Sequence, residues 1–298
     1  MTGLICINKD KDITSFGVVA KVRGITREKK AGHTGTLDPM ATGVLPVMLG
    51  GATRFLDYLP ESDKGYRAGF VLGKTTDTLD ITGEVTAEYE INATEQDVRD
   101  ALERFRGSIT QLPPMYSAVS VNGQRLYELA RQGIEVERES RKVEIKKLEL
   151  VSCESGEYII DVICSKGTYI RTLIDDIGRH LGCGAVMTSL VRTLANGFTL
   201  DDCVTLKQLQ NLKDNNLSFD AALLDIEAIF KAYDCVYVSQ AQAKRFSNGG
   251  ALAADRIKKK LTGGIYRVYS PDNVFLGLGE MDNEDNQLSV KRILVRRD

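Results

Sequence analysis

The sequence is poor in the residues that most often hold metals. Its 298 residues include 2 His, 6 Cys and no Trp. No two Cys have the C-x-x-C spacing of zinc and dithiol sites, and so few His make a mixed site improbable. We therefore expect no metal site. Because the Cys lie mostly among apolar neighbours, we expect buried, reduced thiols.

Long apolar runs are absent as well. No stretch is as long as the roughly 18 apolar residues that a membrane-spanning helix needs. The apolar residues 4–7 are followed by charged Lys9 and Asp10, and they are too few to form the core of a signal peptide. The sequence therefore predicts a cytoplasmic protein that does not insert into a membrane.

Nucleotide-binding loops are incomplete. Residues 69–75 read GFVLGKT, with three residues between the glycines where a phosphate-binding loop has four. Residues 277–279 read GLG and lack the third glycine of the dinucleotide-binding fingerprint. We therefore expect no cofactor.

A strongly basic composition is missing too, since the formal net charge is -2. The charge is uneven, however. Residues 1–74 contain 11 Lys and Arg against 7 Asp and Glu, residues 75–110 contain 3 against 9, and residues 231–298 contain 12 against 8. A local basic face can hold a polyanion on a chain that is acidic as a whole. Nucleic acid therefore remains a possible partner.

The pattern of elements predicts the α+β class, because strands and helices mix without a βαβ rhythm. Residues from about 231 read as a separate unit of short strands with Gly, Pro and Asn turns, which predicts a small β-barrel-like module. We therefore divide the chain into residues 1–230 and 231–298. The expected strands are residues 4–7, 66–72, 143–151, 158–164, 236–238, 265–269, 274–278 and 288–295, and the expected helices begin near residue 16, after Thr94, at 169 and after Ser239.

One segment combines features that are unusual together. Residues 32–47 read GHTGTLDPMATGVLPV, and their glycines permit tight turns and the close approach of a ligand. The single carboxylate, Asp38, precedes a proline that favours an extended conformation at Asp38. An Asp-Pro pair alone is a common turn. Apolar Leu37, Met40 and Val44 are rare in a solvated turn, so we interpret Asp38 as a candidate catalytic residue.

This segment resembles the catalytic motif of the TruB family, the bacterial tRNA pseudouridine-55 synthases. Further segments match that family in order: KGY at 64–66, DTLDITG at 77–83, PPMYSA at 113–118, CSKGTYIRTL at 164–173, and LVRT at 190–193 followed by GF at 197–198. The last residues, from about 231, resemble a PUA module, an RNA-binding pseudo-barrel. The opening departs from the family, because Asp10 and Asp12 stand where the family often has Pro and Gly.

The resemblance implies a pseudouridine synthase fold with a mixed, mainly antiparallel sheet, and a PUA-like pseudo-barrel at the C-terminal end. The reaction breaks the bond from ribose C1′ to uracil N1 and rejoins the base through C5. It needs no redox step and no energy source, which agrees with the lack of a cofactor motif.

The resemblance also implies the residues of the site. Asp38 would be the catalytic carboxylate, and Arg171 would pair with it and lower its pKa. A carboxylate could attack C1′ or C6, or remove a sugar proton, and the sequence leaves these routes open. A uridine must leave its stack to react. Tyr66, Tyr169 and Leu190 would then surround the uracil, with the Tyr66 hydroxyl able to remove the C5 proton.

The implied partner is tRNA, bound through its T-arm. His33 would fill the space that the flipped uridine leaves in the RNA loop, and the C-terminal unit could contact the acceptor stem. We expect a monomer without a guide RNA. Three alternatives stay open: an RNA-binding or RNA-folding factor without activity, a catalytic subunit guided by a separate RNA, and a C-terminal unit that is only structural.

Overall fold

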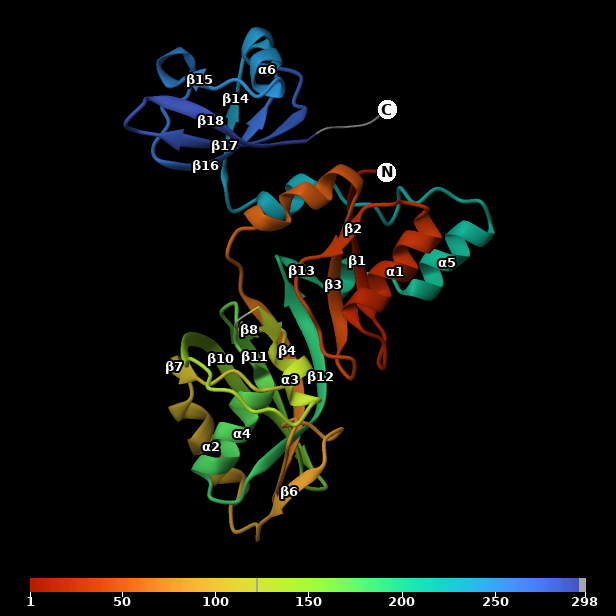
Figure 1. Cartoon of the computed structure of the whole chain (residues 1–298), viewed down its shortest axis with the longest axis vertical. Coiled ribbons are helices and arrows are strands. Elements are labelled where there is room, and N and C mark those ends of the chain that lie inside the picture. Colours follow the sequence, from red (N-terminus) through yellow and green to blue (C-terminus); the bar gives the residue numbers. More distant parts are fainter. Residues whose placement is uncertain (122, 295–298) are drawn as a thin grey trace.

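A mixed sheet runs through the body of the molecule (Figure 1), whose computed structural model describes residues 1–121 and 123–294. In these residues nine strands join in one sheet, ordered β1-β3-β12-β4-β11-β10-β7, with β2 beside β3 and β13 beside β12. Neighbouring strands are antiparallel except β3 and β12, which run parallel. The predicted α+β class with a mainly antiparallel sheet is confirmed. The strands are β1 (Gly3–Lys9), β2 (Ala31–His33), β3 (Thr42–Leu49), β4 (Lys64–Leu72), β7 (Gly107–Gln111), β10 (Arg141–Glu154), β11 (Glu157–Cys164), β12 (Ala185–Ala195) and β13 (Phe198–Thr199).

The strands β3 and β12 lie outside the elements that the sequence predicts. β3 is buried on both faces, so it shows an apolar run instead of alternation. β12 has register irregularities after Met187 and after Arg192, which interrupt its alternation. Gly43 of β3 lies opposite Arg192 with φ +102°, and a Cβ there would be 2.2 Å from the Arg192 carbonyl oxygen. Only glycine permits this approach, which brings the chain before β3 beside β12.

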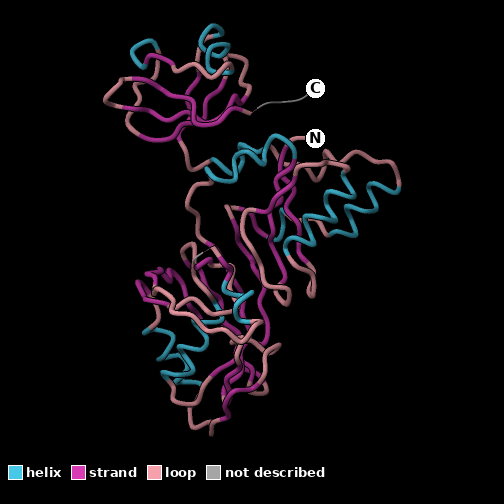
Figure 2. Tube along the Cα trace, viewed as in Figure 1, coloured by secondary structure: helices cyan, strands magenta, loops and turns pink. Residues whose placement is uncertain are grey.

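Helices lie on the outside of the strands (Figure 2). Within the described parts of the chain, no helix is both long enough and apolar enough to cross a membrane. Each of the four predicted helix starts agrees to within one residue with the start of an α-helix, while the others had no predicted start. The α-helices are α1 (Ser15–Thr26), α2 (Glu95–Arg104), α3 (Leu126–Ala130), α4 (Ile170–His180), α5 (Leu206–Asp214) and α6 (Gln240–Ser247), and the 3-10 helices are η1 (Gly50–Tyr58), η2 (Leu200–Asp202), η3 (Ile226–Phe230) and η4 (Ala254–Arg256).

The two faces of the sheet around β1 and β3 pack into different hydrophobic cores. Side chains alternate along a strand, so Ile5 of β1 packs with residues of α1 and α5 while its neighbour Leu4 faces a core with Phe55 of η1. A third core lies farther along the sheet, where α2 and α4 cover β4, β10 and β11. Phe70 of β4 and Ile174 of α4 are fully buried in it. The site described below lies between the part of the sheet around β1 and β3 and the part formed by β4, β10 and β11.

The last part of the chain forms a second, five-stranded sheet at one end of the molecule (Figure 1). Its order is β14-β16-β17-β18-β15, and the predicted cap Ser239 begins α6. β17 continues to Asp282, beyond the predicted end at residue 278. The predicted end of the last strand, residue 295, lies outside the described residues. The strands are β14 (Asp234–Tyr237), β15 (Leu252–Ala253), β16 (Gly264–Tyr269), β17 (Phe275–Asp282) and β18 (Gln287–Ile293), and two separate hairpins are β5 (Lys74–Thr76) with β6 (Val85–Glu88) and β8 (Ser120–Val121) with β9 (Gln124–Arg125).

Aromatic rings join this second sheet to the body. The ring centroid of Phe55 in η1 lies 5.6 Å from that of Phe230 in η3 and 6.2 Å from that of Phe275 in β17. All three side chains are buried. Aromatic pairs at such distances contribute stability beyond the burial of their area. The C-terminal sheet therefore shares a hydrophobic core with the body and is not joined to it by the chain connection alone.

Candidate active site

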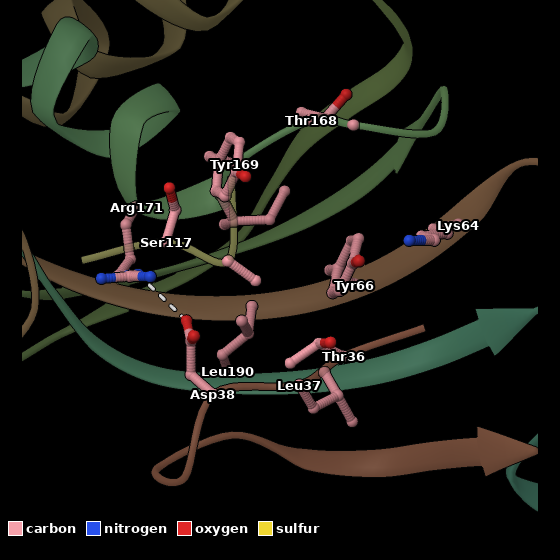
Figure 3. A pocket seen from close by; sticks show the side chains of 13 residues that line it. Thr36, Leu37, Asp38, Lys64, Tyr66, Ser117, Thr168, Tyr169, Arg171 and Leu190 are labelled. Atoms are coloured by element: carbon pink, nitrogen blue, oxygen red, sulfur yellow. Dashed lines mark ion pairs between the residues drawn. The ribbon is translucent and has the colours of Figure 1, made fainter. Parts of the chain in front are cut away.

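A cavity of about 230 Å³ opens where five separate parts of the chain meet (Figure 3). Five of the six predicted site residues line it, namely Asp38, Tyr66, Tyr169, Arg171 and Leu190. The cavity lies between the loop before β3, the strands β4 and β12, the start of α4 and the loop before β8. The other lining residues are Thr36, Leu37, Lys64, Ser117, Ala118, Gly167, Thr168 and Ile170.

An ion pair occupies one end of the cavity. The Nε of Arg171, at the start of α4, lies 3.0 Å from Oδ2 of Asp38. The Arg171 guanidinium also donates to the backbone carbonyls of Thr78 and Tyr116, at 2.9 and 2.8 Å, and lies 3.8 Å from Oδ2 of Asp80. The Arg171 side chain is 6% exposed and that of Asp38 34%. Arg171 is therefore held by protein groups, whereas Asp38 keeps one side open to the cavity.

Two side chains from the first elements of the chain hold the backbone around Asp38. The Ser15 hydroxyl donates to the carbonyl of Leu37 at 3.0 Å and accepts from the Leu37 N–H at 2.8 Å. Lys9 is fully buried, and its Nζ donates to the carbonyl of Pro39 at 3.0 Å. Burial lowers the pKa of Lys9 to about 8, against the opposing effect of the Asp38 charge. The loop is thus tied on both sides of Asp38.

The segment that departs from the TruB pattern keeps its turn. Asp12 stands where the family often has glycine, and its φ of 64° lies in the left-handed region. Asp adopts this region more readily than most residues, at a cost that glycine avoids. The Asp12 N–H donates to the carbonyl of Pro39 at 2.8 Å. With Asp at this position, the turn therefore contacts the loop that carries Asp38.

Arg192 of β12 lies fully buried beneath the same loop. Its guanidinium donates to the carbonyls of Val44, Gly35 and Thr36, at 2.7, 3.1 and 3.2 Å. The nearby Tyr66 side chain acts on the same guanidinium, both by its charge and as a hydrogen-bond partner, and opposes the lowering of the Arg192 pKa. Burial lowers the pKa of Arg192, but a guanidinium stays charged at neutral pH. A buried positive charge that pairs with no carboxylate of the described residues thus lies behind the cavity wall.

The charge state of Asp38 depends on opposing effects. Burial raises the pKa of its carboxyl above the ordinary 3.8, and the nearby Asp80 adds to this rise. Arg171 and Lys9 lower the pKa, but burial outweighs them. Arg171 by itself lowers the Asp38 pKa, as the family resemblance implies, but the net shift of this pKa is upward. Protein atoms surround the carboxylate except on its cavity side, which explains both the desolvation and the remaining exposure.

Aromatic and apolar side chains line the space beside the ion pair (Figure 3). Tyr66 on β4 and Leu190 on β12 are each 7% exposed, and Tyr169 immediately precedes α4. The backbone of Tyr169 is held by both ends of the Gln111 side-chain amide, at 3.0 and 3.2 Å. Burial raises the pKa of Tyr66 to about 12, although Arg192 opposes the shift. The Tyr66 phenol is therefore neutral at pH 7.

His33 is the predicted site residue that does not line this cavity. It lies on β2, paired with Val47 of β3, on the strand that leads into the loop carrying Asp38. Its Nδ1 is buried without a hydrogen-bond partner in the described parts of the chain. Burial and the charge of Arg192 lower the pKa of His33, so its ring is neutral at pH 7.

Sequence reasoning missed several groups of this site. Lys64 and Asp80 lie in segments that match the family, and this match was the only signal for them. Ser117 in the PPMYSA segment is 5% exposed, and its hydroxyl has no hydrogen-bond partner among the described residues. In the same residues, no group of three or more His, Cys, Asp or Glu could hold a metal ion.

The arrangement suits covalent or proton-transfer chemistry on a planar group. One carboxylate is fixed by a buried guanidinium, and its free side faces a space between two tyrosines and a leucine. Aromatic faces bind unstacked nucleic-acid bases, and a positioned carboxylate can act as a nucleophile or a base.

Protein-family models match the chain over most of its length. A model described as "TruB family pseudouridylate synthase (N terminal domain)" matches residues 23–170. One described as "tRNA pseudouridylate synthase B C-terminal domain" matches residues 171–231. A third, "Pseudouridine synthase II TruB, C-terminal", matches residues 235–294. The matches thus extend through both sheets.

Full-length relatives and solved structures agree with these matches. The tRNA pseudouridine synthase B of Pseudomonas fluorescens is 43% identical over 296 residues, which cover 99% of this chain and 96% of that protein. The protein of the same name from Clostridium kluyveri is 42% identical, with 99% and 100% covered. A chain in the "Crystal Structure of a Cbf5-Nop10-Gar1 Complex" aligns with a TM-score of 0.78 at 26% identity, covering 99% of this chain and 86% of that one. The fold is also that of a chain from an H/ACA RNP bound to a substrate RNA, with a TM-score of 0.75 at 24% identity, covering 99% of this chain and 86% of that one.

Proposed function

Because the chain belongs to the TruB family of pseudouridylate synthases, we propose that it isomerises uridine 55 in the T-loop of tRNA to pseudouridine. The observation that carries the proposal is the Asp38 carboxylate, held 3.0 Å from the buried Arg171 and open to a cavity with two tyrosine rings. The relatives named tRNA pseudouridine synthase B support tRNA as the substrate. A base that stays stacked in a folded RNA loop cannot enter this cavity and bring its C1′ to Asp38, so the uridine would be flipped out of the loop.

Asp38 would assist both bond changes. In one route its carboxylate attacks C1′ as the N1 bond breaks, and it leaves again as C5 bonds to C1′. In a second route it removes a proton from the sugar, so that a glycal forms as the uracil departs, and it returns the proton to the sugar as C5 bonds to C1′. A third route, attack of the carboxylate on uracil C6, is also open, and all three need an ionised carboxylate. Arg171 favours that form and orients it, while Leu190 and the ring of Tyr169 would hold the freed base in the cavity.

Tyr66 would handle the proton that C5 loses at the end. Because its phenol has a pKa of about 12, it is neutral at pH 7 and can take this proton only while passing its own to solvent. We expect Tyr66→Phe to bind RNA as the parent does and to slow single-turnover product formation about 100-fold. A rate equal to that of the parent would remove the hydroxyl from the mechanism. Tyr158→Phe on β11 is the matched control, because it removes a buried hydroxyl outside the cavity.

The overall reaction can be tested without any added metal or nucleotide. Purified protein would be incubated with unmodified tRNA transcripts that carry tritium at uracil C5, and the released tritium would be measured. We expect one equivalent per tRNA, from the T-loop uridine. Absent release despite tight binding would instead favour an RNA-binding factor, or a subunit that depends on a guide RNA.

The partner proposals follow from the same assignment. The enzyme would work as a monomer in the cytoplasm and without a guide RNA, which a search for co-purifying small RNA tests directly. His33 would pack into the RNA loop from β2, where its neutral ring can replace the flipped base. The C-terminal sheet would be a PUA-like module that contacts the acceptor stem, through basic residues such as Arg256 and Lys258.

We also propose two folding units, a catalytic domain of residues 1–230 and a PUA-like domain of residues 231–298. The shared aromatic core predicts that they are coupled. A chain that ends at Phe230 should stay folded but lose about 3 kcal/mol of stability, because Phe55 and Phe230 become exposed when Phe275 is absent. Thermal unfolding of the two chain lengths measures the difference. Equal melting temperatures would mean that the domains are independent, and an unfolded short chain would mean that they form one unit.

A further inference from the structure

Lys64 occupies the end of the cavity that the proposed chemistry does not use. It lies on β4, two residues before Tyr66, so both side chains project from the same face of the strand. Figure 3 shows its ammonium at the opposite end of the cavity from the Asp38–Arg171 pair. With the ribose at Asp38 and its base in the cavity, the RNA backbone next to the reacting nucleotide would extend toward Lys64.

This end of the cavity is positively charged. Lys64 Nζ and Arg192 Nη1 lie 3.5 and 3.7 Å from the point where a Gly35 side chain would begin, so two cations converge on one spot. In the described residues, no carboxylate forms an ion pair with either of them, although Asp63, next to Lys64, pairs with Lys146. Burial and the charges of Arg192 and Lys166 lower the pKa of Lys64 to about 8. The groups around Lys64 thus disfavour its positive charge. This is expected at a site where a bound anion supplies the negative charge that the protein does not place there.

We propose that Lys64 forms a phosphate subsite, which binds a backbone phosphate that flanks the flipped uridine of the RNA substrate. Arg192 stays behind the wall on its carbonyl partners and adds positive potential, while the Lys64 ammonium makes the contact. Because Gly35 has no side chain, the space beside the Lys64 ammonium and the Arg192 guanidinium stays free. This subsite rests on the proposed function, because it assigns a role to the part of the substrate next to the reacting nucleotide.

The charge on Lys64 gives the subsite a pH dependence. A phosphate is held by the ammonium and not by the amine, so RNA affinity should fall as the pH rises through about 8. Arginine keeps its charge over this range. Lys64→Arg should therefore bind RNA with nearly the parent affinity and lose the dependence, whereas Lys64→Met should bind weakly at every pH. A merely structural lysine would not produce this pattern.

The test uses the full chain and an unmodified T-arm RNA. We expect Lys64→Met to raise Kd and KM about 10-fold, to leave the single-turnover rate at saturation within about 3-fold, and to reduce the slope of log Kd against log salt by about 1. Lys146→Met is the matched control, because it removes an equal charge from an exposed lysine beside Asp63. Replacing the phosphate on one or the other side of the target uridine by a neutral methylphosphonate locates the contact. The replacement that weakens RNA binding by the parent should leave RNA binding by Lys64→Met unchanged.

Two results would overturn the subsite while leaving the proposed function intact. One is a parent enzyme that is active on this RNA and a Lys64→Met variant with unchanged Kd and salt slope. The other is a Lys64→Met variant that each methylphosphonate weakens as much as it weakens the parent, because the phosphate contact would then not be made by Lys64. A parent enzyme that neither binds nor modifies the RNA would overturn both proposals together.

Discussion

Asp38→Asn is expected to abolish turnover, with a loss of more than about 10,000-fold in the single-turnover rate. The amide can neither attack C1′ nor accept a sugar proton, although it has almost the same shape as the carboxylate. RNA binding should persist, because the tyrosines, Leu190 and the basic groups of the cavity are unchanged. Tritium release from C5-labelled tRNA measures the reaction, and a filter-binding titration measures the affinity.

The fold should tolerate this change. Burial already disfavours the Asp38 charge, as the raised pKa of its carboxyl indicates, so a neutral amide costs the structure little. We expect a melting temperature within a few degrees of the parent. Asp161→Asn is the control, since Asp161 lies on β11 in a surface ion pair with Arg67. Substantial product formation by Asp38→Asn would remove Asp38 from the chemistry.

The same carboxyl predicts the acid side of the pH profile. Because burial raises the Asp38 pKa above the ordinary 3.8, the ionised form is lost at a higher pH than for an exposed aspartate. Activity should therefore fall, as the pH is lowered, before ordinary carboxylates protonate. Single-turnover rates across the acidic range, at saturating RNA, would reveal this limb.

Arg171→Met is expected to lower the single-turnover rate by about 100-fold or more. From the start of α4, the guanidinium holds Asp38 and the backbone carbonyls of Thr78 and Tyr116 in place. A misplaced catalytic group costs a factor of about 100 in rate. Without the cation, the pKa of Asp38 should rise further, because Arg171 is the largest effect that opposes burial. The acid limb of the pH profile should move to higher pH, and this shift separates loss of the charge from a general distortion.

This variant should also be less stable than the parent. Removal of Arg171 leaves Asp38 and Asp80 buried without their cation, and such a loss typically costs about 3 to 5 kcal/mol. The sign of the pH dependence follows from the raised pKa. A carboxyl whose pKa is higher in the folded state than in the unfolded state favours folding as it protonates, so part of the lost stability should return as the pH falls. Arg99→Met, which removes an exposed arginine from its ion pair with the equally exposed Glu95 on α2, is the control. A variant with normal rate and stability would exclude the ion pair from both roles.

Much of the site could be predicted from short segments. Asp38, Tyr66, Tyr169, Arg171 and Leu190 were assigned from motifs that match a known family, and all five line one cavity. A motif preserves residue types and spacing, and these determine which chemical groups are available. His33 does not line the cavity, although it is near Asp38 in sequence, since it lies on β2 where it pairs with Val47 of β3.

Sequence patterns were weakest where burial is complete. The central strands β3 and β12 lack the alternation that reveals a half-buried strand, and β12 carries the fully buried Arg192 directly after apolar Leu190 and Val191. Lys9 likewise looks like the charged end of a strand, yet it is fully buried. A lysine or arginine in a sequence is assumed to reach solvent, and only the surrounding structure reveals that backbone carbonyls hold it instead.

The sequence by itself determined the class of fold, the family and the groups available for chemistry, because each of these depends on residue types at local spacings. Only the tertiary structure decided how those groups behave. Distances between residues far apart in the chain set the net direction of the Asp38 pKa and the carbonyl partners of Arg192 and Lys9. They also leave Lys64 without a carboxylate partner among the described residues, and they form the core that Phe55 shares with Phe275. Desolvation and Coulomb energies follow from such distances and from burial, and neither is contained in the order of residues along one segment.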